Sequence, residues 1–386
     1  MIEAKVTELE SPRPERVQDL LRSNGPRITI LLPPYRPGEP GKSMAGQLKT
    51  YLQDLPHELA ARRIPEPAAL DLLKPLQEQT EEEEFSRGSR FGRAIFRSRD
   101  VFRQFELFGP VQAQCVVGRY FQIRPILSDL HDPREFYLLK LSKKGVELNR
   151  CANLRTEIVQ LPRGVPQTLE EALAFKPPDH DLENRSAAGA STGAMRGIRF
   201  GTGSGRETQH AYLADFYKIV DRGIFELLHD GNAPLILCGV DEDTAAYRMI
   251  HTYPNLLSQS ISGSPGGLRA EQELLQQAYS IVRADHVERT AASLVEWRER
   301  LAPARFTTDL EAILGAAAEG RVEKLYISDS AQRVGVGANA SDARWNEEED
   351  LFNMAAVETI LHGGVAFGLP ANRMPHGAAV AALLRY

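Results

Sequence analysis

Cysteine is scarce in this sequence, and no two cysteines are close enough to form a motif. The 386 residues include three cysteines, and none of them belongs to a CxxC pair. An odd number of widely spaced cysteines argues against a disulfide framework and against a structural zinc site. The same pattern is typical of proteins that fold in a reducing cytoplasm.

Long apolar runs are also absent. No stretch approaches the roughly 18 apolar residues that a membrane-spanning helix needs. The first residues carry charges where a signal peptide requires an apolar segment. We therefore predict a cytoplasmic protein that has no membrane partner. The remaining composition, with 42% hydrophobic and 25% charged residues, is that of an ordinary globular chain.

The chain has no excess of positive charge. Its formal net charge is −6, whereas proteins that coat nucleic acid without sequence preference are usually basic. This balance excludes that class of protein, and DNA is not an expected partner. Any contact with RNA must therefore come from a local basic patch.

Motifs for metal, nucleotide and acyl-transfer chemistry are missing as well. None of the nine histidines belongs to an HExxH pair, and no G-x-S-x-G elbow is present. The glycine-rich residues 201–208 resemble a phosphate loop, but they lack the Gly-Lys-Ser/Thr ending that holds phosphate and magnesium. The sequence thus predicts no metal site and no cofactor.

Hydrophobic periodicity predicts alternating helices and strands. Apolar residues recur at helical spacing over 44–63 and over 208–228, and short apolar runs at 28–32 and 235–240 indicate buried strands. Residues 92–108 are predicted as a single strand. Such alternation predicts an α/β (α+β multidomain) fold.

Breaks in the pattern predict three domains. An N-terminal α/β domain covers 1–132. A central domain covers 133–270 and contains a flexible loop over 176–206, where proline, glycine, serine, alanine and arginine replace any periodicity. A C-terminal domain covers 271–386 and opens with a connecting helix over 271–300.

The predicted loop is the most basic local feature of the chain. Residues 185–206 contain six glycines and a net charge of +4, with no acidic residue. A mobile arginine-glycine segment can fold against phosphates and release counterions. We therefore predict an RNA-binding loop; a surface loop with incidental arginines is the alternative. The RNA-binding candidates are Arg185, Arg196, Arg199, Gly203, Gly205 and Arg206.

A second basic cluster falls within 87–103. Its predicted patch residues are Arg87, Arg90, Arg93 and Arg97. On a strand with outward alternation, these side chains would form a basic stripe. A solvated face is the competing interpretation, and the sequence favours it slightly.

Short motifs in a fixed order carry a resemblance to a known family. They are Phe136-Tyr137-Leu138-Leu139, the strand Pro234–Val240 that contains Gly239, and the terminal Leu384-Arg385-Tyr386. In these motifs the chain resembles the bacterial archaeo-eukaryotic release factor family, which is related to class-one release factors and Pelota. The resemblance implies a central RNase H-like domain and a C-terminal domain of the ribosomal-protein, kink-turn-binding type. It also implies a place at the decoding site of the ribosome, with a translational GTPase as a partner.

The sequence departs from the release factors at their functional tip. Those proteins carry Gly-Gly-Gln on the loop before a long helix, where the glutamine places a water against the peptidyl-tRNA ester. This chain contains no Gly-Gly-Gln, and Gln209 follows the last glycine of the loop by four residues. Gln209 is therefore the one candidate catalytic residue, and the sequence favours a protein that is not an enzyme.

Three functions follow from these observations. The first is a ribosome-associated, Pelota-like factor for rescue or dormancy, which binds rRNA or tRNA without peptidyl-tRNA hydrolysis. The second is an enzyme: a peptidyl-tRNA hydrolase that uses Gln209, or a nuclease with magnesium held by Asp241, Glu242 and Asp243. Those three acids are more typical of the charged first turn of a helix. The third is a protein-interaction adaptor that has lost contact with the ribosome.

Overall fold

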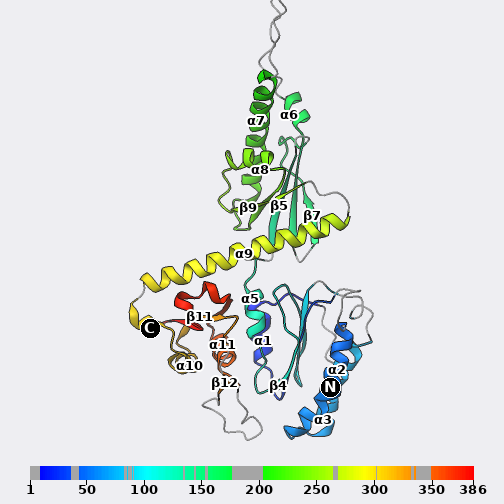
Figure 1. Cartoon of the computed structure of the whole chain (residues 1–386), viewed down its shortest axis with the longest axis vertical. Coiled ribbons are helices and arrows are strands. Elements are labelled where there is room, and N and C mark those ends of the chain that lie inside the picture. Colours follow the sequence, from blue (N-terminus) through cyan, green and yellow to red (C-terminus); the bar gives the residue numbers. More distant parts are fainter. Residues whose placement is uncertain are drawn as a thin grey trace, which may run out of the picture. The chain divides into compact units, whose positions relative to one another are not determined.

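A computed structural model gives the fold of two compact units. It describes residues 9–35, 43–81, 85, 89, 91–133, 135–142, 145–152, 155–175, 203–263, 268–300, 302–331, 334–335 and 349–386. Unit 1 combines Met1–Asp132 with Val287–Tyr386, and unit 2 is Pro133–His286. Both units contain sheets covered by helices (Figure 1), so the predicted multidomain α/β fold is confirmed.

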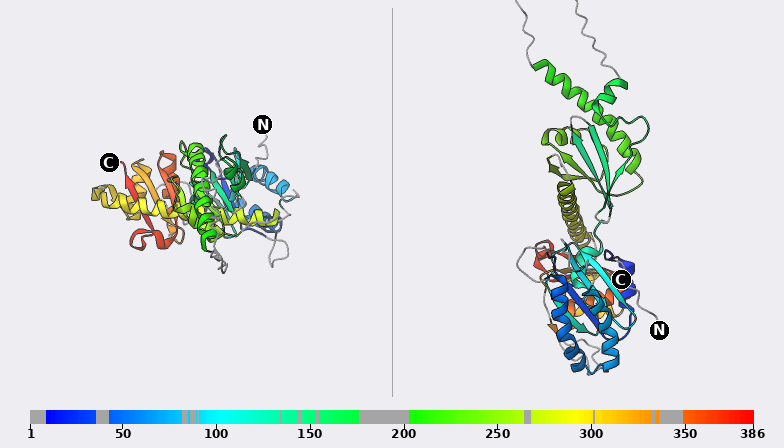
Figure 2. Two further views of the ribbon diagram at one scale, coloured as in Figure 1. Left: turned by 90° about the horizontal axis from the view of Figure 1, so that it is seen from above. Right: turned by 90° about the vertical axis from the view of Figure 1, so that its right-hand side faces the viewer.

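The first sheet of unit 1 is antiparallel and has the strand order β3-β2-β1-β4. Its strands are β1 (Arg27–Leu32), β2 (Gly92–Arg97), β3 (Phe102–Leu107) and β4 (Gln114–Gly118). Helices α2 (Met44–Ala61) and α3 (Glu66–Gln79) cover one face, and α1 (Pro14–Leu21) lies on the other (Figures 1 and 2). The central strands are thus buried on both sides.

The predicted strand over 92–108 is wrong in one respect. Two strands, β2 and β3, replace it, and they are joined by a tight turn in which the Ser98 N–H donates to the Val101 carbonyl at 2.8 Å. The turn falls in the run Ser98-Arg99-Asp100, whose polar side chains cannot continue a strand that is covered on both faces.

The second sheet of unit 1 is mixed and has the order β10-β15-β11-β14. Its strands are β10 (Phe306–Thr307), β11 (Val322–Ser328), β14 (Val365–Leu369) and β15 (Val380–Leu384). Helices α10 (Leu310–Ala318) and α11 (Leu351–Leu361) contribute to the core on one face. The end of α9 (Leu268–Arg300) packs Ala291 and Leu294 against Tyr326 and Leu383 on the other.

The two sheets of unit 1 share a single hydrophobic core. Phe96 and Phe121 of the first region belong to the same buried cluster as Ile313 and Phe352 of the last region. The side chain of Asn353 on α11 joins the regions by hydrogen bonds: its Oδ1 accepts from the Ile123 N–H at 2.8 Å, and its Nδ2 donates to the Phe121 carbonyl at 2.9 Å. The N-terminal and C-terminal regions therefore share one core and form a single compact unit.

Unit 2 is built on a five-stranded sheet of order β7-β6-β5-β8-β9. Its strands are β5 (Glu135–Ser142), β6 (Gly145–Ala152), β7 (Arg155–Val159), β8 (Leu235–Gly239) and β9 (Leu256–Ser262). The strands β5, β6 and β7 form an antiparallel meander, while β8 and β9 run parallel to β5. This order and these directions agree with the RNase H-like domain that the resemblance implies.

Helices cover both faces of this sheet. The long helix α7 (Gly203–Leu228) packs Phe216, Val220 and Ile224 on one face, together with α8 (Asp241–Arg248) and α6 (Leu169–Phe175). The first half of α9 packs Leu274 and Ala278 on the other face. The predicted stripe on α7 is buried except at Leu227, whose side chain is 39% exposed.

The remaining elements are short. They are η1 (Arg124–Ile126), α5 (Leu127–Leu130), η2 (Pro303–Arg305), β12 (Val334–Gly335), β13 (Glu349–Asp350), η4 (Ala371–Arg373) and η5 (Pro375–Gly377). Among the described residues, no helix has the length and apolar character needed to cross a membrane.

Candidate functional site

The predicted RNA-binding loop ends where α7 begins. This helix starts at Gly203, so Gly203, Gly205 and the backbone of Arg206 belong to its first turns rather than to the loop. The predicted loop over 176–206 is therefore shorter at its end than expected. Arg185, Arg196 and Arg199 lie outside the described residues.

The position of Gln209 differs from that of a release-factor tip. It is the seventh residue of α7, and its backbone is therefore helical. Inside an α-helix the N–H group donates to the carbonyl four residues earlier, so it is not available to orient a water. The geometry at Gln209 thus lacks the irregular glycine-rich backbone of the Gly-Gly-Gln tip.

A buried hydrogen-bond network holds α7 in place. Asp221 of α7 is 3% exposed, and its Oδ1 accepts from the Tyr247 hydroxyl on α8 at 2.9 Å. Its Oδ2 accepts from the N–H and the hydroxyl of Thr252 at 2.9 and 2.7 Å. Burial, and then the nearby Asp221 carboxylate, raise the pKa of Tyr247. These contacts fix the helix that follows the predicted loop to the rest of unit 2.

Two of the four residues of the second predicted basic patch are buried. Arg93 and Arg97 lie on the face of β2 that α3 covers, and their side chains are 7% and 2% exposed. The Arg97 guanidinium donates to the carbonyls of Leu72 and Asp71 at 3.2 and 2.7 Å, while Arg93 lies 4.3 Å from the centre of the Phe85 ring. Arg93 and Arg97 do lie on the same side of the strand, but that side faces α3 rather than solvent. Arg87 and Arg90 lie outside the described residues.

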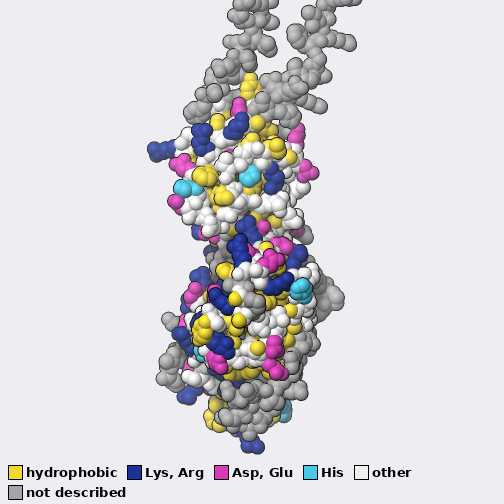
Figure 3. Space-filling model, turned by 90° about the vertical axis from the view of Figure 1, so that its left-hand side faces the viewer, with side chains coloured by type: hydrophobic (Ala, Val, Ile, Leu, Met, Phe, Trp, Pro, Cys, Tyr) yellow, Lys and Arg dark blue, Asp and Glu magenta, His cyan; other side chains and the backbone are white. Residues whose placement is uncertain are grey.

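The charged side chains on one face of the molecule are of mixed sign (Figure 3). On the face drawn in Figure 3, basic and acidic side chains are interspersed with apolar ones, and no broad patch of a single sign forms among the coloured residues. A nucleic-acid surface would need a local excess of positive charge. This face therefore offers no broad RNA-binding surface.

The acidic group after β8 is the first turn of α8. Asp241, Glu242 and Asp243 open that helix, where negative charge stabilises the helix dipole. The Asp241 carboxylate accepts from the Ser262 hydroxyl at 2.8 Å, and Asp243 is 1% exposed. Among the residues that the structure describes, no cluster of three or more histidines, cysteines and acids could hold a metal ion. The structure thus confirms the interpretation of these three acids as the charged first turn of a helix.

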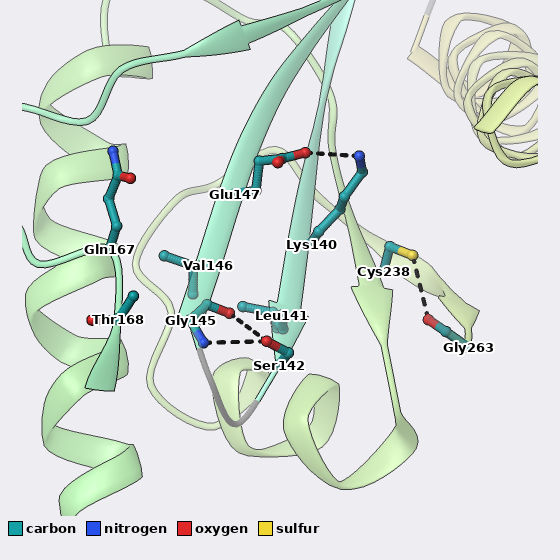
Figure 4. A pocket seen from close by; sticks show the side chains of 10 residues that line it. All are labelled: Lys140, Leu141, Ser142, Gly145, Val146, Glu147, Gln167, Thr168, Cys238 and Gly263. Carbon is teal, nitrogen blue, oxygen red and sulfur yellow. Dashed lines mark hydrogen bonds and ion pairs between the residues drawn. The ribbon is translucent and has the colours of Figure 1, made fainter. Parts of the chain in front are cut away.

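A shallow pocket lies beside the carboxyl ends of β5 and β8. Its volume is about 410 Å³, and Figure 4 shows its lining. Between β5 and β8 the strand order reverses, because the chain goes from β5 outward through β6 and β7 and then returns to β8 on the other side. Ligands of open α/β sheets commonly bind at such a switch point. The lining residues are Lys140, Leu141, Ser142, Gly145, Val146, Glu147, Gln167, Thr168, Cys238 and Gly263.

The polar groups of this pocket bond to one another. Lys140 Nζ lies 2.8 Å from the Glu147 carboxylate and 3.9 Å from that of Glu271. The Ser142 hydroxyl donates to the Gly145 carbonyl at 2.9 Å and accepts from its N–H, which closes the β5–β6 hairpin. Burial raises the pKa of the Cys238 thiol. The Lys140, Glu147 and Ser142 side chains are thus engaged with groups of the hairpin, and burial disfavours the thiolate form of Cys238.

Sequence reasoning missed this pocket, although one signal for it was present. Ser142 pairs with Gly145 across the hairpin, so Lys140 must face Glu147 two residues further along each strand. The position of Cys238 next to this pair depends on the parallel pairing of β5 with β8, which joins residues about a hundred positions apart in the chain. No local pattern predicts that pairing.

Comparisons with known structures and curated proteins give the following result. The archaeal translation termination factor aRF1 is 14% identical over 96% of both chains, with a TM-score of 0.22. Archaeoglobus fulgidus Pelota is 13% identical over 77% of this chain and 80% of its own, with a TM-score of 0.34. Ribosome-bound archaeal Pelota is 9% identical over 98% and 95%, with a TM-score of 0.37. No curated protein matches the sequence.

The family assignment comes from the sequence of the second unit and its continuation. Residues 135–321 match the bacterial archaeo-eukaryotic release factor family 3. The matched segment begins at the first residue of β5 and includes the whole five-stranded sheet, α7 and α9. Residues 135–321 therefore belong to the bacterial archaeo-eukaryotic release factor family, as the sequence motifs predict.

Proposed function

We propose that this protein is a ribosome-associated factor of the rescue or dormancy type that does not hydrolyse peptidyl-tRNA. The observation that carries the proposal is the helical backbone at Gln209 in a release-factor-like domain that has no Gly-Gly-Gln. Such a domain keeps the scaffold that a ribosome factor needs and lacks the group that positions the water. It would therefore bind the ribosome without releasing the nascent chain.

The partner of the basic segment before α7 is rRNA or tRNA in this proposal. The stretch 185–206 contains four arginines and no acid, which gives it a charge of +4, and the last of them, Arg206, lies in the first turns of α7. Phosphates are the anions that arginine forks bind best. A translational GTPase is the protein partner that the resemblance implies. The cytoplasm is the compartment in which both partners would be met.

Co-sedimentation with purified ribosomes tests the proposal. The full chain is compared with a variant in which Arg185, Arg196, Arg199 and Arg206 are changed to alanine. We expect the wild-type protein to pellet with ribosomes at low salt, and the slope of log affinity against log salt to be shallower in the variant by about 3, at roughly 0.7 to 0.9 per phosphate contact.

A matched control removes the same charge from other exposed positions. Arg13, Arg155, Arg163 and Arg222 are exposed, and their simultaneous change to alanine lowers the net charge equally. We expect this control to pellet as the wild type does. Absence of ribosome binding by the wild type at low salt, with salt-insensitive capture of a protein partner, would instead support the adaptor function.

A release assay separates the proposed factor from a hydrolase. Purified ribosomes that carry labelled peptidyl-tRNA are incubated with the wild-type protein and with Gln209→Ala. We expect no release above the ribosome-only background with either protein. Release by the wild type that Gln209→Ala abolishes would overturn the non-catalytic function and assign the reaction to Gln209.

A further inference from the structure

One end of the first sheet of unit 1 gathers three turns. Because β1 is antiparallel to both of its neighbours, Arg27 at its start pairs with Gly118 at the end of β4, and Ile28 pairs with Arg97 at the end of β2. The turns at 22–27, 98–101 and 118–120 must therefore meet at this end. They come from separate parts of the sequence, so no single stretch of chain reveals the cluster.

Hydrogen bonds join the first and third turns, and the second turn lies beside the first. The Arg27 guanidinium donates to the carbonyl of Ser23 in its own turn and to that of Arg119 in the third turn. Gly25, which has a φ of 86°, faces the second turn: a β-carbon placed on it would lie 3.9 Å from that of Arg99. Arg119 lies with its guanidinium 5.3 Å from the centre of the Tyr120 ring. The three turns thus form one preorganised surface.

This surface has a strong excess of positive charge. The turns contain the four arginines Arg22, Arg27, Arg99 and Arg119 and a single acid, Asp100, which gives a net charge of +3. Arg22 and Arg99 are exposed, and Arg27 and Arg119 are half-buried. Among the described residues, the structure gives no ion pair to Arg22, Arg27 or Arg99. The charges of these three arginines are therefore available to an external anion.

Several other arginines of unit 1 pair with acids. The exposed Arg300 lies 2.7 Å from Glu296, and the half-buried Arg321 lies 2.6 Å from Glu319. The face in Figure 3 likewise mixes both signs. Like charges held together by backbone contacts repel one another, and a bound polyanion relieves that repulsion. RNA phosphates, spaced along a backbone, fit several arginine forks at once.

We propose that this end of the first sheet is a second RNA-binding surface that contacts the phosphate backbone. It is defined by Arg22, Arg27, Arg99 and Arg119. This inference rests on the proposed function only for the source of the RNA. It is separate from the basic segment before α7, because the two belong to different units. Arg22 and Arg99 supply exposed contacts. Arg27 is a positioning residue that joins two of the turns.

Binding of the full chain to a short labelled RNA duplex tests this surface without ribosomes. The double variant Arg22→Ala with Arg99→Ala removes two exposed contacts. We expect its slope of log affinity against log salt to be shallower than that of the wild type by about 0.7 to 0.9 for each arginine removed. The variant Arg22→Lys with Arg99→Lys keeps both charges and should keep the wild-type slope.

Arg13→Ala with Arg163→Ala is the control for net charge, since both arginines are exposed and lie outside the three turns. It should bind the duplex as the wild type does. An unchanged slope in Arg22→Ala with Arg99→Ala, or no duplex binding by the wild type at low salt, would overturn the proposal. Circular dichroism of each variant establishes that a lost contact is not a lost fold.

Ribosome co-sedimentation of the same variants separates this proposal from the proposed function. Duplex binding that depends on Arg22 and Arg99 supports the surface even if the wild type does not pellet with ribosomes, in which case only the ribosomal role is lost. Reduced pelleting by Arg22→Ala with Arg99→Ala and unchanged duplex binding would overturn the surface, since the partner would then be a protein.

Discussion

At the scale of single residues, three arginines from one sequence cluster have different fates. Arg93 and Arg97 are buried under α3, whereas Arg99 is exposed in the turn that follows. The period-two alternation was visible in the sequence, but it does not tell which side of a strand a helix will cover. The cover comes from residues 66–79, about twenty positions away, and no helix was predicted there. Burial of an arginine also needs acceptors, and here α3 supplies backbone carbonyls.

The pair Arg97 and Arg99 gives a test of this difference. In Arg97→Met, the carbonyls of Leu72 and Asp71 lose a charged donor, and we expect unit 1 to lose about 1 to 3 kcal/mol of unfolding free energy. Arg99→Met is the matched control and should change it by less than about 0.5 kcal/mol. Urea unfolding followed by tryptophan fluorescence measures this directly, because both tryptophans, Trp297 and Trp345, belong to unit 1. Equal stability of the two variants would contradict the buried position of Arg97.

At the scale of elements, the long helix and the apolar strands were predictable, while the two edge strands of unit 2 were not. The apolar stripe predicted over 208–228 is buried except at Leu227, because a helix with one wide apolar stripe packs that stripe against the core. The strand β8 is apolar throughout and is buried throughout. By contrast, β7 and β9 are edge strands whose polar, partly exposed residues have neither a continuous apolar run nor a clean alternation. They form because β6 and β8 offer them a partner.

The hairpin of β5 and β6 makes a pH-dependent contribution to the free energy of unfolding of unit 2. The hydrogen bond from Lys140 lowers the pKa of Glu147 below its ordinary value of 4.5. The ion pair therefore stabilises the folded state above about pH 4.5, and its contribution is lost as the pH falls through the lowered pKa. Since the side chains of Lys140 and Glu147 are 20% and 41% exposed, we expect Lys140→Met to cost at most about 1 kcal/mol at neutral pH.

Hydrogen exchange of the β5 and β6 amides across the pH range measures this cost. The difference in amide protection between Lys140→Met and the wild type should disappear as the pH falls through the lowered pKa of Glu147. In a Glu147→Gln background the titrating group is gone, so Lys140→Met should show no pH trend there. A trend that persists in that background would assign the effect to Glu271, which lies 3.9 Å from Lys140.

At the scale of the whole molecule, the first and last regions of the chain form one unit. The sequence contains two sets of alternating helices and strands, and each set on its own predicts a separate domain. Neither set indicates that Phe96, Phe105 and Phe121 complete a core with residues of α10 and α11. The evenly apolar character of α11 is a trace of this arrangement, because a helix that is buried on most sides has no polar face. Only the long-range contacts settle which regions share a core.

Asn353 provides the last test, since its side chain bonds three backbone groups of the first region from a helix of the last. In Asn353→Ala, the N–H groups of Ile123 and Arg124 and the carbonyl of Phe121 lose their partner in a buried site, which we expect to cost at least about 1 to 3 kcal/mol. If the two regions are one cooperative body, amide protection should fall together in β1 to β4 and in β11, β14 and β15. Asn372→Ala, at an exposed position, should leave both unchanged. Loss of protection confined to the last region would mean that the first sheet is stable alone, and that the shared core is a docking interface between two independent domains rather than a condition for folding.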